Sequence, residues 1–171
     1  MNSYLREGIL MEAETLADGR LVLSDVKLIF RNFSGRPSQY NQEGTRNFCV
    51  LLNTDVANDL KSKGWNVRFS EVRNEGDEPQ AYMGVAVSFE HYPPTVTLVT
   101  SKNQTLLKET DIGMLDWADV EKADLIIRPY SWDVSGKKGI KAYLKSMYVT
   151  IEEDPLAEKY SEVPSEVPVG S

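Results

Sequence analysis

The chain contains a single cysteine, Cys49, and a single histidine, His91, among its 171 residues. One cysteine excludes an internal disulfide, and one residue of each kind cannot build a zinc site from Cys and His ligands. Cys49 lies in the apolar run NFCVLL, so we expect it to pack as a small hydrophobic side chain rather than to react. We therefore expect no metal site and no cofactor.

Long apolar runs and phosphate-binding loops are absent as well. No stretch of about 18 apolar residues occurs, so the sequence predicts no membrane span. The opening stretch MNSYLREGILMEAET has acids within its short apolar segment and is not typical of a signal peptide, which makes the cytoplasm the expected location. Neither GxGxxG nor GxxxxGK(S/T) is present, so we expect no loop that cradles a nucleotide phosphate.

Short segments of alternating polarity dominate the rest of the chain. The longest, residues 21–33, predicts one strand with Val26, Leu28 and Phe30 on its better-buried face. A short helix is predicted over TDVANDLKSKG, and a weakly helical piece over ETDIGMLDWADVEKA. About seven strands with one or two short helices predict a mainly β domain, either a small barrel or a sandwich.

Acidic charge is concentrated near the printed end of the chain. The formal net charge is -7, yet residues 149–171 alone carry six acids against the single Lys159. The preceding residues are therefore nearly neutral, and a basic patch within them is compatible with a polyanionic partner. We interpret residues 1–151 as the domain and residues 152–171, which are acidic and contain three prolines, as a flexible tail.

Positive charge and aromatic rings gather in PYSWDVSGKKGIKAYLKSMYV, residues 129–149. Side chains alternate along a strand, so Ile140, Ala142 and Leu144 share an apolar face while lysines and a tyrosine share the other. The second face suits single-stranded nucleic acid, because flat bases stack on rings and cations neutralise phosphates. The predicted contacts are Arg128, Tyr130, Trp132, Lys137, Lys138, Lys141, Tyr143 and Lys145.

The turn between the two strands sets how these side chains pair. Glycine suits the first central position of a type II′ turn, so the sequence predicts that turn at Gly136–Lys137. Trp132 would then lie opposite Lys141, and Tyr130 opposite Tyr143. The alternative is that the rings pack in the core and the lysines form only a solvated face. The alternation of rings with lysines favours the binding face over this alternative.

A second basic and aromatic region surrounds SGRPSQYNQEGT, residues 34–45, which is predicted to be a long loop. Loops of this length inside compact domains are often functional, and this one could close over a strand of nucleic acid. Its predicted contacts are Arg31, Phe33, Arg36, Tyr40 and Arg46, although Phe33 is equally compatible with a core position. Trp65 and Trp117 are expected to be core residues.

Six blocks carry a resemblance to a known family: LIFRNFSG, NQEGTRNFCVLL, GWNVRF, EGDEPQAYMGVAVSF, MLDWADV and IRPYSWDVSGKKGIKAYLKSMYVTIEEDPL. In this order they resemble single-stranded DNA-binding proteins of tailed bacteriophages and prophages, over nearly all of residues 24–160. The resemblance implies an OB-type barrel that coats single-stranded DNA during phage replication or recombination, in the cytoplasm of the host cell. It also implies that the protein is not an enzyme.

The tail departs from the bacterial single-stranded DNA-binding pattern. Bacterial proteins of this kind end in an acidic tip with a terminal aromatic residue, whereas the printed sequence ends VPVGS. The resemblance therefore implies at most that the acidic tail meets phage replication or recombination proteins, and not that it does so through such a tip. Self-association into a homo-oligomer is compatible with a protein that coats DNA.

Two other function classes stay open at this point. The first is a protein interaction or assembly module that uses the acidic tail and the aromatic patch. The second is a metal-dependent nuclease, which would need carboxylates such as Asp116 and Asp119 to converge on divalent ions. Ordinary solvated acids in a helix and in turns account for the same residues, which disfavours the nuclease.

Overall fold

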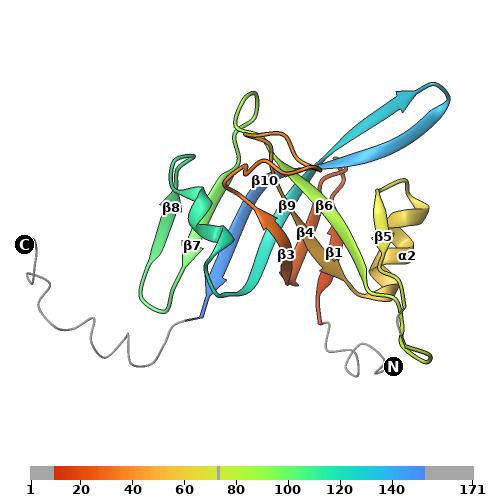
Figure 1. The fold of residues 1–171 in the computed structure, drawn as a ribbon, viewed down its shortest axis with the longest axis horizontal. Helices are drawn as coiled ribbons and strands as arrows, with labels where there is room; N and C mark the ends of the chain where they lie inside the picture. Colours follow the sequence, from red (N-terminus) through yellow and green to blue (C-terminus); the bar gives the residue numbers. More distant parts are fainter. Residues whose placement is uncertain (1–9, 73, 153–171) are drawn as a thin grey trace, which may run out of the picture.

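The computed structural model describes residues 10–72 and 74–152, which form a mainly β domain (Figure 1). Its strands are β1 (Glu12–Thr15), β2 (Leu21–Val26), β3 (Leu28–Asn32), β4 (Arg46–Leu52), β5 (Val67–Phe69), β6 (Ala81–Val87), β7 (Thr95–Val99), β8 (Gln104–Leu107), β9 (Val120–Val134) and β10 (Lys137–Ile151). The helical elements within these residues are the α-helix α2 (Thr54–Ser62) and the short 3₁₀ helix η1 (Ile112–Asp116).

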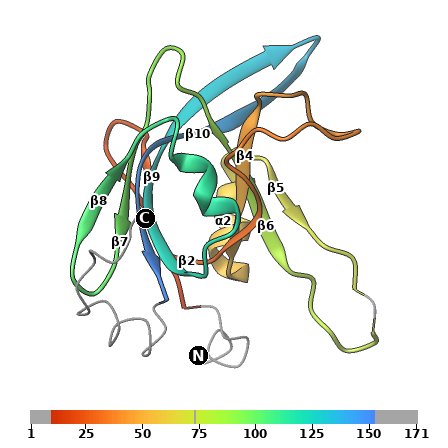
Figure 2. The same ribbon diagram turned by 60° about the vertical axis from the view of Figure 1, so that its left-hand side comes forward.

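Hydrogen-bonded strands follow the order β1-β2-β9-β10-β6-β4-β3, and this sheet is not closed by pairing between its ends. However, β2 and β3 are consecutive and are separated only by Lys27, so the chain passes directly from β2, next to one end of this order, to β3 at the other end (Figure 2). β10 runs parallel to β6 and antiparallel to β9. This is the arrangement of a partly open OB-like barrel, which confirms the predicted fold class.

Two connections extend from the same end of this barrel. They are the β3–β4 loop, residues 33–45, and the hairpin formed by β9 and β10, which projects farthest from the body (Figures 1 and 2). OB folds bind oligonucleotides with the outer face of their second and third strands and with the loops that flank it. In this chain β4 and β6 occupy those two strand positions, and the two connections flank them.

The interior of the barrel is apolar. β4 turns Phe48, Val50 and Leu52 inward, and β6 turns Met83 and Val85 inward, each with at most 1% of its surface exposed. Successive side chains of a strand point to opposite faces, so the intervening residues of β4 and β6 form the outer face. Burial of one face thereby fixes which residues remain available to a ligand.

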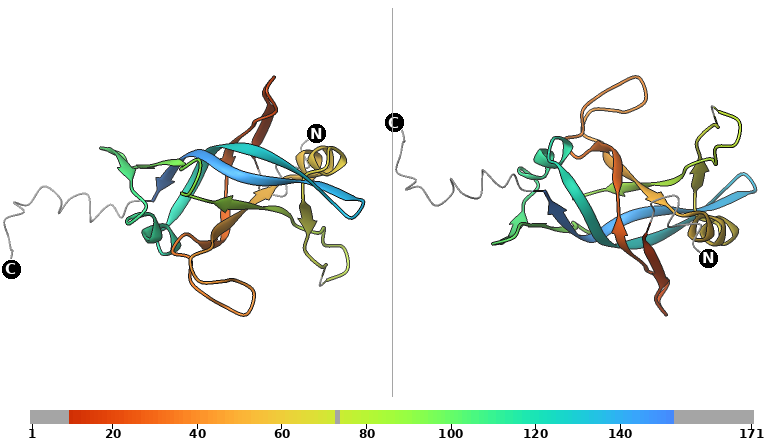
Figure 3. Two further views of the ribbon diagram at one scale, coloured as in Figure 1. Left: turned by 90° about the horizontal axis from the view of Figure 1, so that it is seen from above. Right: turned by 90° about the horizontal axis from the view of Figure 1, so that it is seen from below.

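Helix α2 covers one end of the sheet beside the hairpin (Figure 3). Asn53 caps it, since its side-chain oxygen accepts a hydrogen bond from the Val56 N–H at 2.9 Å. Ala57 and Leu60 are buried on the helix, and Trp65 packs after it with 6% exposure. The predicted short helix and the core position of Trp65 are therefore confirmed.

The single strand predicted over residues 21–33 is wrong, because the chain breaks into β2 and β3 at Lys27. Asp25 and Phe30 take positive φ angles of 58° and 51°, and the register of β3 against β4 slips. Such irregularities reverse the alternation of side chains. As a result Phe30 is 69% exposed instead of inward, and Phe33 is fully buried.

The predicted hairpin turn at Gly136–Lys137 is wrong by one residue. Its central residues are Ser135–Gly136, whose φ angles of 52° and 82° are both positive, as a type I′ turn requires. The pairing register moves by two residues, so Trp132 lies opposite Gly139 rather than Lys141. A shift of two residues keeps every side chain on its predicted face.

A register shift at Lys145 bends β10 and reverses its alternation. Ala142 and Leu144 are buried before this position, and Met147 and Val149 are buried after it. The bend lets β10 pair with β9 along its whole length, with β6 near the hairpin and with β7 farther on. The predicted apolar face is thus present as far as Leu144.

No helix within residues 10–72 and 74–152 is long and apolar enough to cross a membrane. The last strand ends at Ile151, and the predicted acidic tail from residue 153 onward lies outside the described residues. The division into a domain and a tail therefore stays a prediction.

The position of Phe33 generates a stability prediction. Its ring stacks on Phe48 with centroids 4.9 Å apart inside the barrel, so Phe33→Ala should lower the free energy of unfolding by about 3–5 kcal/mol. Phe30→Ala, which removes an exposed ring, is the matched control and should cost about 0.5 kcal/mol or less. Urea unfolding followed by circular dichroism measures both. Equal effects of the two substitutions would contradict the assignment of Phe33 to the core.

Candidate nucleic-acid interface

Five side chains form what we call the hairpin face: Arg128, Tyr130, Trp132, Lys141 and Tyr143. Tyr143 lies at its centre, because its ring meets Tyr130 edge-on with centroids 6.1 Å apart. The guanidinium carbon of Arg128 lies 5.1 Å from the Tyr143 centroid, and the Lys141 ammonium nitrogen lies at the same distance. Cations near an aromatic ring are attracted by its quadrupole, so these contacts preorganise the hairpin face.

The cations of the hairpin have no carboxylate partner within the part of the chain that the structure describes. Its ion pairs there involve other residues. The cations concerned are Arg128, Lys137, Lys138, Lys141 and Lys145. All four lysines are exposed, and Arg128 is half-buried beneath neighbouring rings. Their charge is therefore available to an anionic ligand.

The indole of Trp132 packs closely against Gly139 of the opposite strand. A Cβ atom placed on Gly139 would come within 2.6 Å of the indole ring, so only glycine leaves room for this packing. The ring remains 37% exposed and lines an open cavity of about 570 Å³ between the hairpin and the end of α2. Gly64, which follows α2, ties this end of the helix to β10, because its carbonyl accepts a hydrogen bond from the Ile140 N–H at 2.9 Å.

The outer face of the barrel continues from the hairpin face. Tyr143 is paired in register with Ala86 of β6, and Gly84, two residues before Ala86, is also on this outer side. Farther along, the rings of Tyr82 and Phe30 meet edge-on with centroids 5.7 Å apart. We call Phe30, Cys49, Arg68, Tyr82, Gly84 and Ala86 the sheet face. Small side chains in its middle leave the backbone accessible between two aromatic groups.

Burial raises the pKa of the Cys49 thiol, and nearby Arg68 opposes this rise only in part. The side chain is half-buried on the sheet face. A thiol whose pKa is raised is protonated near neutral pH, so it packs as a neutral group and is not an activated nucleophile. The expectation that Cys49 packs as a small apolar side chain agrees with this environment.

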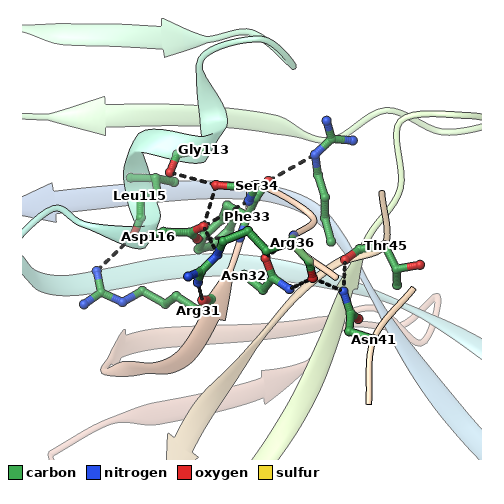
Figure 4. Close-up of polar contacts among 11 residues, drawn as sticks. Arg31, Asn32, Phe33, Ser34, Arg36, Asn41, Thr45, Gly113, Leu115 and Asp116 are labelled. Atoms are coloured by element: carbon green, nitrogen blue, oxygen red, sulfur yellow. Dashed lines mark hydrogen bonds and ion pairs between the residues drawn. The ribbon is translucent and has the colours of Figure 1, made fainter. Parts of the chain in front are cut away.

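The arginines around the β3–β4 loop serve the fold rather than a free surface. Arg31 donates from Nη1 to the carbonyl oxygen of Leu115 at 2.9 Å (Figure 4) and to that of Ala118 at 2.7 Å. Arg46 donates from Nε to the carbonyl of Phe33 at 3.0 Å and pairs with Glu109 at 3.1 Å. Their guanidinium groups therefore already have partners within the fold, and their predicted contact with DNA stays a prediction.

The Asp116 carboxylate organises the start of this loop, and its side chain is fully buried. It accepts hydrogen bonds from the Phe33 N–H at 2.5 Å, from the Ser34 N–H at 3.2 Å and from the Ser34 hydroxyl at 2.5 Å. Arg36 Nε lies 3.6 Å from the same carboxylate (Figure 4). Phe33 itself is buried, so the prediction that it stacks on a base is wrong.

Two aromatic residues near the loop are strongly exposed. Tyr40 is 88% exposed at the loop, as its predicted role in binding requires. Trp117 is 74% exposed, so the expectation of a core position is wrong. It follows η1 directly, and the Arg36 guanidinium lies over its ring at 5.0 Å from the centroid.

A groove of about 600 Å³ lies between the loop and the hairpin. It is lined by Thr45 and Arg46 on one side, by Lys141 and Tyr143 on the other, and by residues 86–90. The loop and the hairpin face are thus the two walls of one groove. Glu90 and Glu109 also line it, so its lining combines two acids with the two cations.

Sequence reasoning missed the half-buried ring of Tyr82 and the exposed rings of Phe30 and Tyr92. Tyr82 could have been found, because β6 alternates apolar residues with Tyr82, Gly84 and Ala86. Phe30 could not, since a positive φ reverses its face. Tyr92 lies in a loop, and only the fold reveals that the Arg128 guanidinium sits 4.8 Å from its ring centroid.

Carboxylates do not converge on a metal site in the part of the chain that the structure describes, where no group of three His, Cys, Asp or Glu residues could hold an ion. Asp116, which the nuclease alternative required, is committed to backbone and side-chain donors. The structure thus offers no support for metal-assisted hydrolysis by these residues.

A barrel with an exposed face of rings and unpaired cations defines a class of proteins that bind single-stranded nucleic acid. The family described as “Putative phage ssDNA-binding domain” matches residues 13–168, and the chain belongs to this family. No curated protein matches the chain significantly.

Solved structures with the same fold include the single-stranded DNA-binding protein of bacteriophage Enc34. A C-terminal truncation of it has a TM-score of 0.53 and 15% identity, covering 84% of this chain and 91% of that chain. The Enc34 protein in complex with ssDNA has a TM-score of 0.53 and 14% identity, covering 84% and 92%. At this level of identity the similarity establishes the fold.

The packing of Trp132 on Gly139 can be tested by adding one methyl group. Gly139→Ala should displace the indole, change tryptophan emission and cost about 1–3 kcal/mol of stability. Gly84→Ala is the matched control, because its nearest neighbour would lie 3.9 Å away. Fluorescence spectra and thermal unfolding measure both variants. If Gly139→Ala behaves like Gly84→Ala, the ring does not rest on the glycine.

Proposed function

We propose that this protein binds single-stranded DNA without regard to sequence and coats it during phage DNA replication or recombination. The observation that carries the proposal is the hairpin face, where exposed rings are held between cations that have no carboxylate partner among the described residues. Family membership supports it, and so does the fold shared with the Enc34 protein, which was solved with ssDNA.

The hairpin face supplies two separable contributions. Tyr130, Trp132 and Tyr143 stack on bases, each stacked base contributing about 1–3 kcal/mol. The cations neutralise phosphates, and this contribution weakens as salt rises because binding releases counterions. Stacking is tolerant of sequence, since every base has a flat aromatic face. No Asn or Gln of the kind that pairs with a base edge belongs to the hairpin face.

Single strands fit this surface better than a duplex does. Paired bases hide their faces inside the double helix, whereas rings on the hairpin need those faces open. Duplex readers commonly place a helix in the major groove. The helix α2 carries Asp55 and Asp59 with Lys61, so it lacks the basic character expected of such a helix.

The sheet face extends the proposed path, and Tyr40 with Lys137 and Lys138 would meet the strand from the loop and the hairpin tip. We propose that the protein acts by binding alone, without catalysis, in the cytoplasm of the host cell. Contacts of the acidic tail with phage replication or recombination proteins, and self-association on DNA, stay predictions.

Two substitutions separate the charge contribution from the stacking contribution. Lys141→Ala should weaken binding to oligo(dT) and reduce the slope of log K against log salt by about 0.7, because one phosphate contact is lost. Trp132→Ala should weaken binding about 5- to 100-fold and leave that slope unchanged. Fluorescence anisotropy of labelled oligo(dT) at several salt concentrations measures both quantities.

Lys102→Ala is the matched control, because this exposed lysine lies at the β7–β8 turn, far from the hairpin (Figure 1). It should bind oligo(dT) like the unmodified protein. A duplex of equal length should bind more weakly than the single strand. Equal affinity for both forms, or no binding at low salt, would refute the proposed function.

A further inference from the structure

Trp117 is the most exposed of the three tryptophans, at 74% against 37% for Trp132 and 6% for Trp65. It lies outside the hairpin face and the sheet face, in the short connection between η1 and β9. Single exposed apolar residues are common on protein surfaces and need no explanation by themselves. However, contacts with neighbouring residues fix the position of Trp117, as described next.

Trp117 is held by one contact of its backbone and one contact of its ring. Its backbone N–H donates to the Met114 carbonyl at 3.1 Å, which fixes it to η1. The Arg36 guanidinium lies over the ring at 5.0 Å and is itself placed by Asp116, at 3.6 Å, and by the Arg31 carbonyl, at 3.3 Å. A buried carboxylate thus positions an arginine that in turn positions an exposed indole.

Trp117 and the hairpin face are linked through the β3–β4 loop. Asp116, the residue before Trp117, binds the start of this loop at Phe33 and Ser34 (Figure 4). Arg46, at the far end of the loop, donates to the carbonyl of Phe33 and lines the groove that Lys141 and Tyr143 also line. Contacts of the loop therefore connect the segment that carries Trp117 to one wall of the groove.

We propose that Trp117 is a further base-stacking position for single-stranded DNA, and that Arg36 is the positioning residue of its ring rather than a phosphate contact. This inference rests on the function proposed above. Stacking tolerates any base and is stabilised further by a cation beside the indole. The acids Asp111 and Asp119, exposed on either side of η1, disfavour a phosphate there, so the contribution is expected to be independent of salt.

Oligonucleotides of graded length test this position. Trp117→Ala should weaken binding of long oligo(dT) about 5- to 100-fold and leave unchanged the binding of oligomers too short to extend beyond the hairpin. The salt slope should stay the same, and Trp117→Phe should retain most of the affinity. Leu106→Ala, which removes a 61% exposed side chain on β8, is the control and should bind normally.

The role of Arg36 is tested by a substitution that keeps its charge. Lysine lacks the planar guanidinium and cannot reproduce its contacts, so Arg36→Lys should weaken the binding of long oligo(dT) to a similar degree as Trp117→Ala. It should have little further effect when Trp117 is already alanine, as expected for residues that act together. Full affinity of Arg36→Lys, with a reduced salt slope for Arg36→Ala, would instead assign Arg36 to a phosphate.

Emission from Trp117 gives an independent readout. In a Trp132→Phe background, long oligo(dT) should still quench fluorescence, because the remaining tryptophans are the exposed Trp117 and the buried Trp65. Absence of quenching, or long-oligomer binding by Trp117→Ala as tight as that of the unmodified protein, would overturn this inference. The proposed function would survive that result if Trp132→Ala still bound oligo(dT) more weakly than the unmodified protein does. Failure of the unmodified protein to bind any oligomer would overturn both.

Discussion

The hydrogen bonds to the buried carboxylate of Asp116 are the contacts on which the candidate interface depends most. Hydrogen bonds to a charged group each contribute about 1.5–3 kcal/mol, and this carboxylate accepts three of them at the exit of β3. They hold Phe33 in the core and Ser34 at the start of the loop. Because Arg36 faces the same carboxylate, the position of the arginine over Trp117 also follows from it. One carboxylate therefore fixes both the packing of Phe33 in the core and the positions of the loop and of Arg36 on the surface.

Much of the fold could be predicted from alternation because burial of one strand face constrains the sequence directly. The strands, the capped helix and the two faces of the hairpin follow from this rule. The prediction fails where the backbone departs from a regular strand, at Phe30 and at the Ser135–Gly136 turn. A residue with positive φ reverses the face or moves the turn, and an ordinary Phe or Ser gives no warning of it. Phe30 is exposed instead of inward for this reason, and Phe33, which was equally compatible with a contact and with the core, is buried.

The side chains of the hairpin face could be placed from the sequence because they come from one local element. Charge and rings alternate within about twenty consecutive residues, and a register error of two left their faces unchanged. The contacts around the loop could not be predicted as well. Arg31, Arg36 and Arg46 resemble free cations in the sequence, yet their partners lie 63 to 87 residues away or in the backbone. Only the fold reveals which cations are already neutralised or bonded.

The same distinction explains how an acidic chain can present a nucleic-acid surface. What attracts a phosphate is the local balance of charge within about a Debye length, roughly 8–10 Å at physiological salt, rather than the net charge. The described ion pairs engage acids with arginines and lysines of the body and leave the hairpin cations unpaired there. Where arginines are bonded, as beside Trp117, the remaining attraction is stacking, which does not depend on salt. The two ends of the interface therefore differ in kind: the hairpin combines charge with rings, and the η1 end relies on a positioned ring.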